Sequence, residues 1–347
     1  MMFTQSNRAM AAGALLAAAA LGATDARADA VEDFYKGKNL SIIVGFSPGG
    51  GYDLNARAVG RYIGKHIPGN PRVIVQNMPG AGSITAINHM ANIAPKDGTA
   101  IATFARGTPF EPLMGNKQAQ FDPRNLTWIG SPGRETNLVF TRSGANFKTL
   151  EDMKGREVVI ATSGGGADTA TFPLIMNAVF KTKIKVVTGY PGASEMLLAV
   201  ERGEADGMAG LSWGYLKVAR PSWVSEKKVD VQLQLGMTKA ADLPNVPSAI
   251  DLVKDPAERQ FLEVFLARLA IAWPLAGPAN IPADRAAALR AAFAATMKDA
   301  EYKAEAEKQA LEIDPVFADE INAILKSVYN ASPEAIERAR QIAEAAR

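Results

Sequence analysis

The run Ser47-Pro48-Gly49-Gly50-Gly51 has the residue types to hold an anion. It follows the strand-like apolar run Leu40–Val44 and precedes a helical pattern through Ala56, Val59 and Ile63. Glycines let a ligand come close to the backbone, and the unpaired N–H groups and dipole of a helix N-terminus favour negative charge. The residues therefore indicate a site for a carboxylate or phosphate. The alternative is that the same run only turns a strand into a helix.

A second glycine run repeats this arrangement further along the chain. Val73–Asn77 has the composition of a strand, Met78–Ser83 forms a loop, and Ile84–Ile93 has helical spacing. A third strand is expected at Ala100–Phe104. Strands that alternate with helices predict a parallel sheet with helices on its faces. Because ligands bind beyond the carboxyl ends of such strands, we expect both glycine loops at one edge.

Residues for catalysis, metal binding or cofactor binding are scarce. The chain has no cysteine, and its two histidines, His66 and His89, lie on expected helices without a second ligand at metal spacing. Gly80-Ala81-Gly82 resembles an incomplete dinucleotide loop, with Thr85 where the third glycine should be. No Gly-x-Ser-x-Gly motif occurs. We therefore expect no enzyme activity, no cofactor and no metal.

The N-terminus has the pattern of a secretory signal. Residues 1–8 carry one arginine, residues 9–23 are almost all Ala, Leu and Gly, and Ala26-Arg27-Ala28 is a small-x-small cleavage site. We expect cleavage before Asp29 and a location in the periplasm of a Gram-negative cell. No later run is apolar and long enough to cross a bilayer. The formal net charge of +2 gives no field for nucleic acid or an anionic membrane.

The second half repeats the strand–helix alternation and then becomes helical. Thr149 should cap a helix at Leu150–Lys154, and Glu157–Ala161, Ile184–Val187 and Val231–Leu235 should be strands. A helix is expected at Ala257–Leu269, followed by a return strand at Ile271–Pro274. Three Ala- and Glu-rich helices should follow, the first beginning at Pro282–Arg285.

With these motifs in place, the chain resembles the TctC/Bug family, the extracytoplasmic solute receptors of tripartite tricarboxylate transporters. The first motifs that carry the resemblance are Phe46–Asp53 with Ala56-Arg57, and Asn77–Ser83. Further matches are Ala94–Thr99, Tyr190–Ala193, Gly203–Asp206 and Leu243–Ser248. The resemblance implies the α/β fold of a type II periplasmic binding protein, in which two α/β lobes are joined by a hinge with a ligand cleft between them.

The resemblance also implies a domain division. Residues 1–28 would be the signal peptide, and residues 29–132 the first segment of lobe I. Residues 133–245 would form lobe II, and residues 246–347 would return to lobe I with a helical C-terminus. The stretch Trp128–Thr141, interrupted near Pro132, is expected to cross between the lobes.

By position, the loops of lobe I would grip one carboxylate of the ligand, and loops of lobe II would contact its distal end. The implied contacts in lobe I are Phe46, Ser47, Pro48, Gly49, Gly50, Gly51, Tyr52, Asp53, Gly80, Ala81, Gly82 and Ser83. Those in lobe II are Ser163, Gly164, Gly165, Thr169, Tyr190, Gly192, Ala193, Ser194, Ser212 and Trp213.

The sequence departs from the family pattern at several positions. Some members have an acid after the strand near Gly210, where this chain has Ser212 and Trp213, which argues against an amino-acid ligand. Arg106 and Arg134 stand where uncharged residues are usual, and an arginine fork suits a second carboxylate. The alternative for each arginine is a surface ion pair or a hinge contact. Asp168 is expected to start a helix rather than to contact the ligand.

These observations predict a monomeric periplasmic receptor for a di- or tricarboxylate or an aromatic acid. It would close about its hinge and deliver the ligand to membrane permease subunits, with no nucleic-acid partner and no membrane insertion of the mature chain. Two alternatives remain: a sensory protein that reports to a membrane signalling partner, and an exported hydrolase.

Overall fold

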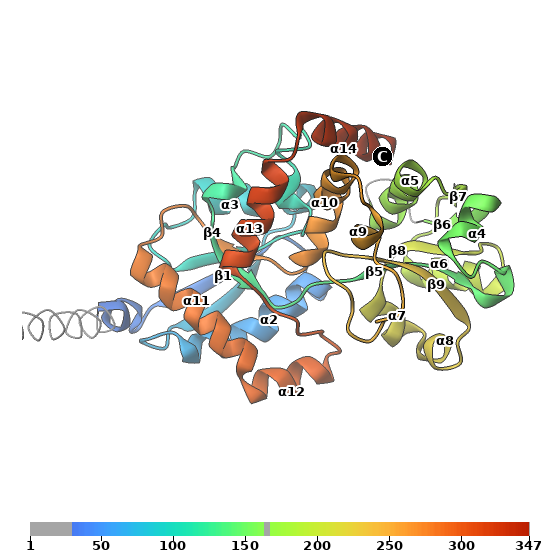
Figure 1. The fold of residues 1–347 in the computed structure, drawn as a ribbon. Helices are drawn as coiled ribbons and strands as arrows, with labels where there is room; N and C mark the ends of the chain where they lie inside the picture. The colour runs from blue at the N-terminus through green and yellow to red at the C-terminus, as the bar shows by residue number, and fades with distance from the viewer. Residues whose placement is uncertain (1–29, 163–166, 347) are drawn as a thin grey trace, which may run out of the picture. The chain divides into compact units, whose positions relative to one another are not determined.

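The chain divides into two compact units, and its described residues form two sheets with helices (Figure 1). The computed structural model describes residues 30–162 and 167–346, so the expected signal peptide and the predicted contacts Ser163, Gly164 and Gly165 lie outside the described residues. Unit 1 comprises the chain up to Thr103, Asn125–Ile129 and Leu275–Glu305. Unit 2 comprises Phe104–Arg124, Gly130–Pro274 and Ala306–Arg347.

The sheet that contains the first three strands is parallel at its centre, as the alternating pattern predicts. β1 (Asn39–Val44) pairs in parallel with β2 (Arg72–Asn77) on one side and with β3 (Ala100–Thr103) on the other. β10 (Leu275–Gly277) pairs antiparallel with β3, and the full order is β11-β4-β10-β3-β1-β2. β4 is Thr127–Ser131 and β11 is Val316–Phe317. Because β1 and β2 run in the same direction, the two glycine loops leave the same edge, which confirms that expectation.

Helices α2 (Gly51–Ile63) and α3 (Ile84–Asn92) follow the two glycine loops. Ala56, Val59 and Ile63 are buried on one face of α2, at the spacing of an amphipathic helix. α11 (Ala283–Lys298) lies beside α2 (Figure 1). α12 (Ala300–Lys308) begins where Asp299 accepts a hydrogen bond from the backbone N–H of Glu301. The contact with α11 supports α2, the helix that carries the first glycine loop at its N-terminus.

The second sheet has the order β7-β6-β8-β5-β9. β6 (Val158–Ala161) pairs in parallel with β7 (Ile184–Val187) and with β8 (Gly207–Ser212). β5 (Asn137–Arg142) runs antiparallel to β8 and to β9 (Val229–Leu235). One apolar cluster between this sheet and its helices includes Phe140, Leu197, Met208 and Trp213.

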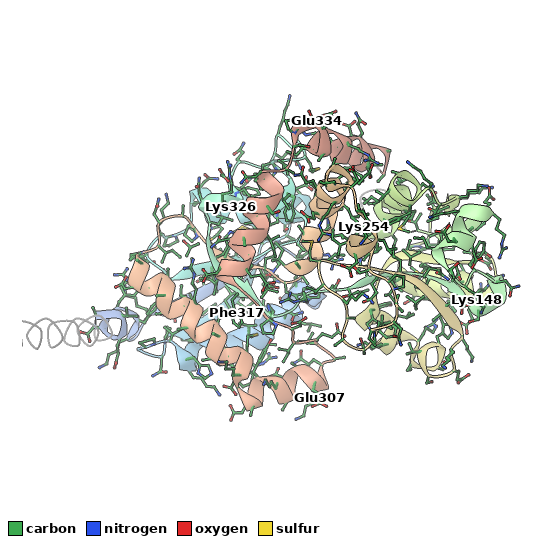
Figure 2. All side chains as sticks on the ribbon, viewed as in Figure 1. Lys148, Lys254, Glu307, Phe317, Lys326 and Glu334 are labelled. Atoms are coloured by element: carbon green, nitrogen blue, oxygen red, sulfur yellow. The ribbon has the colours of Figure 1, made fainter. Side chains whose placement is uncertain are left out.

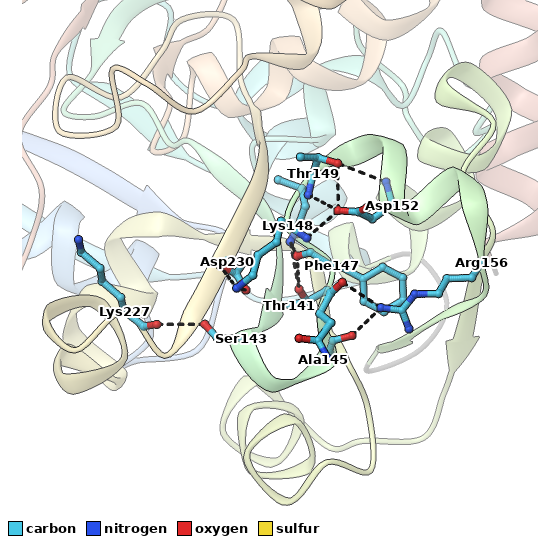
Figure 3. A network of polar contacts seen from close by, with 12 residues as sticks. Thr141, Ser143, Ala145, Phe147, Lys148, Thr149, Asp152, Arg156, Lys227 and Asp230 are labelled. Atoms are coloured by element: carbon cyan, nitrogen blue, oxygen red, sulfur yellow. Dashed lines mark hydrogen bonds and ion pairs between the residues drawn. The ribbon is translucent and has the colours of Figure 1, made fainter.

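The helices of the second unit begin with α4 (Leu150–Gly155), whose N-terminus is capped as the sequence predicts. Thr149 and Asp152 form a capping box, and Arg156 lies over the Phe147 ring, 3.7 Å from its centroid (Figure 3). The remaining helices are α5 (Asp168–Phe180), α6 (Ala193–Arg202), α7 (Trp213–Ala219), α8 (Pro221–Ser225), α9 (Ala249–Leu252), α10 (Pro256–Ala270), α13 (Ala318–Tyr329) and α14 (Pro333–Ala345).

Two expectations from the sequence are wrong. Ile271–Pro274 is not a strand, because Ile271 ends α10 and the strand begins only after Pro274, at Leu275. A short buried apolar run has the same sequence pattern whether it forms a strand or follows the end of a helix, so the pattern alone does not distinguish the two. The C-terminal region has four helices among its described residues, not three, because the chain leaves the helical conformation at Asp299 and starts α12 there.

Charged side chains lie on the surface of unit 2. Lys148, Lys254, Lys326 and Glu334, all labelled in Figure 2, are exposed. Among the described helices, none combines the length and the apolar character needed to cross a bilayer.

Candidate functional site

The first glycine loop is exposed and leads directly into α2. Ser47, Pro48, Gly49, Gly50 and Gly51 are all exposed. Gly49 has φ +88°, which a residue with a side chain rarely adopts, whereas Gly50 is in an extended conformation as the N-cap of α2. Within the described residues, no acceptor bonds the N–H of Gly50 or Gly51. The loop therefore presents two exposed donors at the positive end of a helix dipole.

The second glycine loop has an unusual backbone. Gly80, Ala81, Gly82 and Ser83 all have positive φ, at +147°, +46°, +61° and +72°. Alanine and serine adopt such angles only where their surroundings hold them there, and strain of this kind collects at functional sites. Gly80, Ala81 and Gly82 are exposed, and Ser83 is buried. This loop therefore exposes a second stretch of backbone at the same sheet edge, in a left-handed conformation that residues with side chains seldom adopt.

The two loops lie against each other. A Cβ added at Gly45, the residue after β1, would come within 2.3 Å of the Ser83 Cβ, so only glycine permits this approach. The Phe46 and Tyr52 rings stack with their centroids 4.5 Å apart across the first loop. Asn77, the last residue of β2, donates to the Phe46 carbonyl oxygen over 2.9 Å. The twelve lobe I contacts expected from the sequence are thus brought together in unit 1.

Asp53 lies beneath this surface rather than on it. Its side chain is 2% exposed, and its carboxylate accepts from the Gly49 N–H at 2.8 Å, the Arg57 Nε at 2.9 Å and the Asn77 Nδ2 at 2.8 Å. The hydrogen bond from Arg57 lowers the pKa of Asp53 to about 2, against the effect of burial and with help from Gly49 and Asn77. Asp53 is therefore ionised at any physiological pH.

This shift predicts how the stability of the protein depends on pH. A carboxyl group with a lowered folded-state pKa stabilises the fold above its unfolded pKa, and that contribution disappears as the pH falls through the folded pKa. We expect Asp53→Asn to lower the free energy of unfolding by about 2 kcal/mol at pH 6. Unfolding in denaturant should show the gap from wild type shrinking between pH 4 and pH 2. A gap of constant size would mean that Asp53 does not carry this charge-dependent term.

In unit 2, Arg106 belongs to a compact ionic cluster. It pairs with Glu135 and, at 2.5 Å, with Asp168, which also lies 3.6 Å from Arg268. Asn137 donates to the same carboxylate at 3.3 Å. Burial acts to raise the pKa of Asp168, yet the charges of Arg106 and Arg268 hold it below its usual range. Asp168 is the first residue of α5, as expected, and Arg106 makes the ion pair that was one of its two alternatives.

Arg134 and Trp213 line a pocket of about 330 Å³ within unit 2. Arg134 pairs with Asp314 at 3.1 Å and with Glu320 at 3.0 Å. The indole Nε1 of Trp213 donates to Asp242 at 2.9 Å. Lys217, whose Nζ lies 5.3 Å from the Trp213 ring centroid, is shared by Asp242 and Glu312. The pocket thus has an aromatic wall, and the charges of its arginine and of Lys217 are already paired.

The other lobe II contacts expected from the sequence are at the starts of helices. Thr169 is buried in the first turn of α5, where its hydroxyl accepts from Thr162 at 3.2 Å. Gly192 is the N-cap of α6, Ala193 is its first residue, and Ser212 caps α7. The hydroxyls of Ser194 and Tyr215 lie 3.3 Å apart, which brings the starts of α6 and α7 together. Tyr190 packs against the apolar cluster of this unit. Whether these residues contact a ligand stays a prediction.

Four residues that the structure joins to the expected site were not among the contacts expected from the sequence, although two of them stand in the motifs that carry the resemblance. They are Gly45, Arg57, Asn77 and Arg268. A signal for Arg57 was present, because it stands four residues after Asp53 on a helix, the spacing of an ion pair. Nothing local to Asn77 or Arg268 shows their partners, which are distant in sequence. Within residues 30–162 and 167–346, no group of three or more His, Asp and Glu side chains is placed to hold a metal.

Similarity to known proteins lies in the sequence of a curated relative and in the fold. No family model matches the sequence. A curated relative, the UPF0065 protein in the gbd 5′ region of Cupriavidus necator, is 26% identical over 254 residues, which is 70% of this chain and 72% of the relative.

Several solved structures share the fold. A TctC solute binding protein from Polaromonas superposes with a TM-score of 0.71 at 18% identity, over 90% of this chain and 99% of that one. The periplasmic binding protein BugD gives a TM-score of 0.56 at 16% identity, over 89% and 98%. MatC from Rhodopseudomonas palustris, solved with bound malate, gives 0.54 at 18% identity, over 88% and 99%. The resemblance that the motifs indicate is confirmed: this chain has the periplasmic binding protein fold and resembles the TctC/Bug family of solute-binding proteins.

Proposed function

We propose that the protein is a periplasmic solute-binding receptor that captures a small carboxylate through its two glycine loops. The observation that carries the proposal is the pair of adjacent loops at one sheet edge, where Gly50 and Gly51 offer exposed N–H groups at the start of α2. Convergent N–H groups and a helix dipole bind anions without a cationic side chain. A carboxylate is the anion that best suits the resemblance to TctC and Bug proteins.

The ligand class is a di- or tricarboxylate or an aromatic acid. MatC, which shares the fold, is described with bound malate, a dicarboxylate. In our proposal one carboxylate meets the glycine loops of unit 1. The distal end meets residues expected from the sequence, such as Ser194, Ser212 and Trp213. Hinge closure would then hold the ligand, since only contacts that favour the closed form can drive closure.

Export and a membrane partner complete the proposal. The leader at residues 1–28 would direct the chain to the periplasm, where its fold relatives are described as working. The receptor would deliver its ligand to the permease subunits of a tripartite transporter. Among the described residues no group of three or more His, Asp and Glu side chains is placed to hold a metal, so a metal-dependent hydrolase has no specific support.

Thermal unfolding against a panel of mono-, di-, tri- and aromatic carboxylates, with amino acids, tests the proposal. A ligand present at 100 times its dissociation constant should raise the free energy of unfolding by about 2.7 kcal/mol, which gives a clear rise in melting temperature. We expect this rise with one or more di- or aromatic acids. A rise with amino acids alone, or with no member of the panel, would contradict the proposed ligand class.

A further inference from the structure

Three side chains beneath the glycine loops form a closed ring of hydrogen bonds. Arg57 donates from Nε to Asp53 and from Nη2 to the Asn77 Oδ1, both at 2.9 Å. Asn77 completes the ring by donating from Nδ2 to the second oxygen of Asp53 at 2.8 Å. Arginine suits this position because its planar guanidinium donates from two nitrogens at once, to Asp53 and to Asn77. Each member therefore fixes the other two.

This ring reaches the backbone of the first loop at two points. The Gly49 N–H donates to Asp53, and the Phe46 carbonyl oxygen accepts from Asn77. Phe46 and Gly49 bracket the exposed Ser47-Pro48 turn, and Gly49 has a left-handed backbone that needs support. Asn77 itself ends β2 and leads directly into the second loop. The ring thus links both loops to α2 through one set of part-buried polar groups.

The ring does not offer Asp53 to a ligand. The aspartate residue is 1% exposed, and both its oxygens already accept from protein donors. A ligand ammonium would have to displace Arg57 or Asn77 to reach it. The charge of Asp53 is also matched by that of Arg57, so the pair adds no net charge under the loops. What it adds is a fixed geometry, and a preorganised site loses less entropy when a ligand binds.

We infer that Asp53, Arg57 and Asn77 are positioning residues that hold the two glycine loops in their anion-binding arrangement. This inference rests on the proposed function, because it assigns the ring to the carboxylate site. Carboxylate affinity then depends on three side chains that never touch the ligand. Removing a supporting contact of a binding site costs on the order of 10- to 100-fold in affinity.

The test combines Asp53→Asn and Asn77→Asp with the exchange of the two side chains, Asp53→Asn/Asn77→Asp. The single change at Asp53 removes the charge and replaces one carboxylate oxygen by an amide nitrogen, which then faces either the donors of Gly49 and Arg57 or the donor of Asn77. The double change restores a carboxylate beside Arg57 and a donor between positions 53 and 77, but it leaves the Phe46 carbonyl oxygen without its donor. Two quantities are measured for each variant. One is the affinity for the carboxylate that gives the largest thermal shift, and the other is amide hydrogen exchange across residues 46–51 and 78–83. Glu263→Gln is the matched control, because it neutralises another Arg pair at the same helical spacing.

We expect Asp53→Asn to weaken binding by about 10- to 100-fold and to speed exchange in both loops, with exchange in β3 and α11 unchanged. The double variant restores the charge pair with Arg57 but not the donor to Phe46, so its losses should be smaller than the two single losses added together, and Glu263→Gln should change neither. Wild-type affinity in Asp53→Asn, or a double variant that adds the two single losses together, would overturn the inference.

Two further outcomes have separate consequences: a variant that does not fold, and a wild-type protein that binds no carboxylate. If Asp53→Asn does not fold, Arg57→Lys replaces it, since lysine keeps the charge but cannot bridge Asp53 and Asn77, and it must show the same paired losses. If the wild-type protein binds no carboxylate, the proposed function fails. The exchange measurement then still decides whether the ring holds the loops, because loops that exchange as in wild type would overturn that claim.

Discussion

Gly50→Val is expected to abolish carboxylate binding in a protein that remains folded. Gly50 has φ −81° and ψ 170°, angles that valine adopts easily, and a Cβ added there meets no heavy atom within 4 Å. The fold therefore has room for the side chain, but the two methyl groups would cover the exposed N–H groups at the start of α2. Affinity should fall by about 100-fold or more, which is at least about 2.7 kcal/mol of binding free energy.

The matched control is Gly155→Val. Gly155 is also exposed, has no left-handed backbone, and has no atom within 4 Å of an added Cβ. It is the last residue of α4, away from the glycine loops. Calorimetric titration should give wild-type affinity for this variant and none for Gly50→Val, with circular dichroism showing both folded. Normal binding by folded Gly50→Val would remove the role of the first glycine loop.

The same substitution at Gly82 is a less direct test. A Cβ there also meets open space, but its φ of +61° strains any side chain. Gly82→Val should lose both stability and binding, so its lost affinity could not be assigned to the site alone.

Arg106→Ala should produce a large loss of stability. The substitution leaves Asp168 and Glu135 without the guanidinium that pairs with both. Removing one partner of this part-buried ion pair leaves an uncompensated charge and costs about 2 kcal/mol, less than the loss at a fully buried pair. Arg268, at 3.6 Å, offsets part of this for Asp168. Denaturant unfolding should show the loss, and Arg106→Ala/Asp168→Asn should be more stable than the sum of the two single changes predicts.

The same variant distinguishes the two roles that the sequence left open for Arg106. If Arg106 also contacts a second carboxylate, Arg106→Ala weakens dicarboxylates much more than monocarboxylates. Equal losses of affinity for the two ligand classes would mean that Arg106 only stabilises the ionic cluster and does not contact the ligand. The selectivity ratio is the readout, because a change in stability affects both ligand classes alike.

The sequence predicts the parts of this molecule that depend on neighbouring residues. The strand, glycine loop and helix at Leu40–Ile63 and the capped start of α4 were foreseeable because each has a local signature. The alternation of strands and helices predicted parallel strands, and parallel strands place the two glycine loops at the same sheet edge.

Features that depend on distant partners were not foreseeable. Arg106 is 29 residues from Glu135 and 62 from Asp168, and Asn77 is 24 residues from Asp53. Nor does the spacing of glycines reveal that Ala81 and Ser83 adopt left-handed angles, because alanine and serine seldom do so. The sequence thus indicates the loops that we propose bind an anion, and the structure adds the contacts that hold the first of them.

The central claim is that backbone N–H groups of the two glycine loops bind a carboxylate. Calorimetric titration of the protein with the dicarboxylate that gives the largest thermal shift, and with the diamide of the same acid, tests it most directly. The account predicts saturable binding of one acid per chain and at least about 100-fold weaker binding of the diamide, which lacks the charge that the helix dipole favours. Equal affinity for acid and diamide would contradict it.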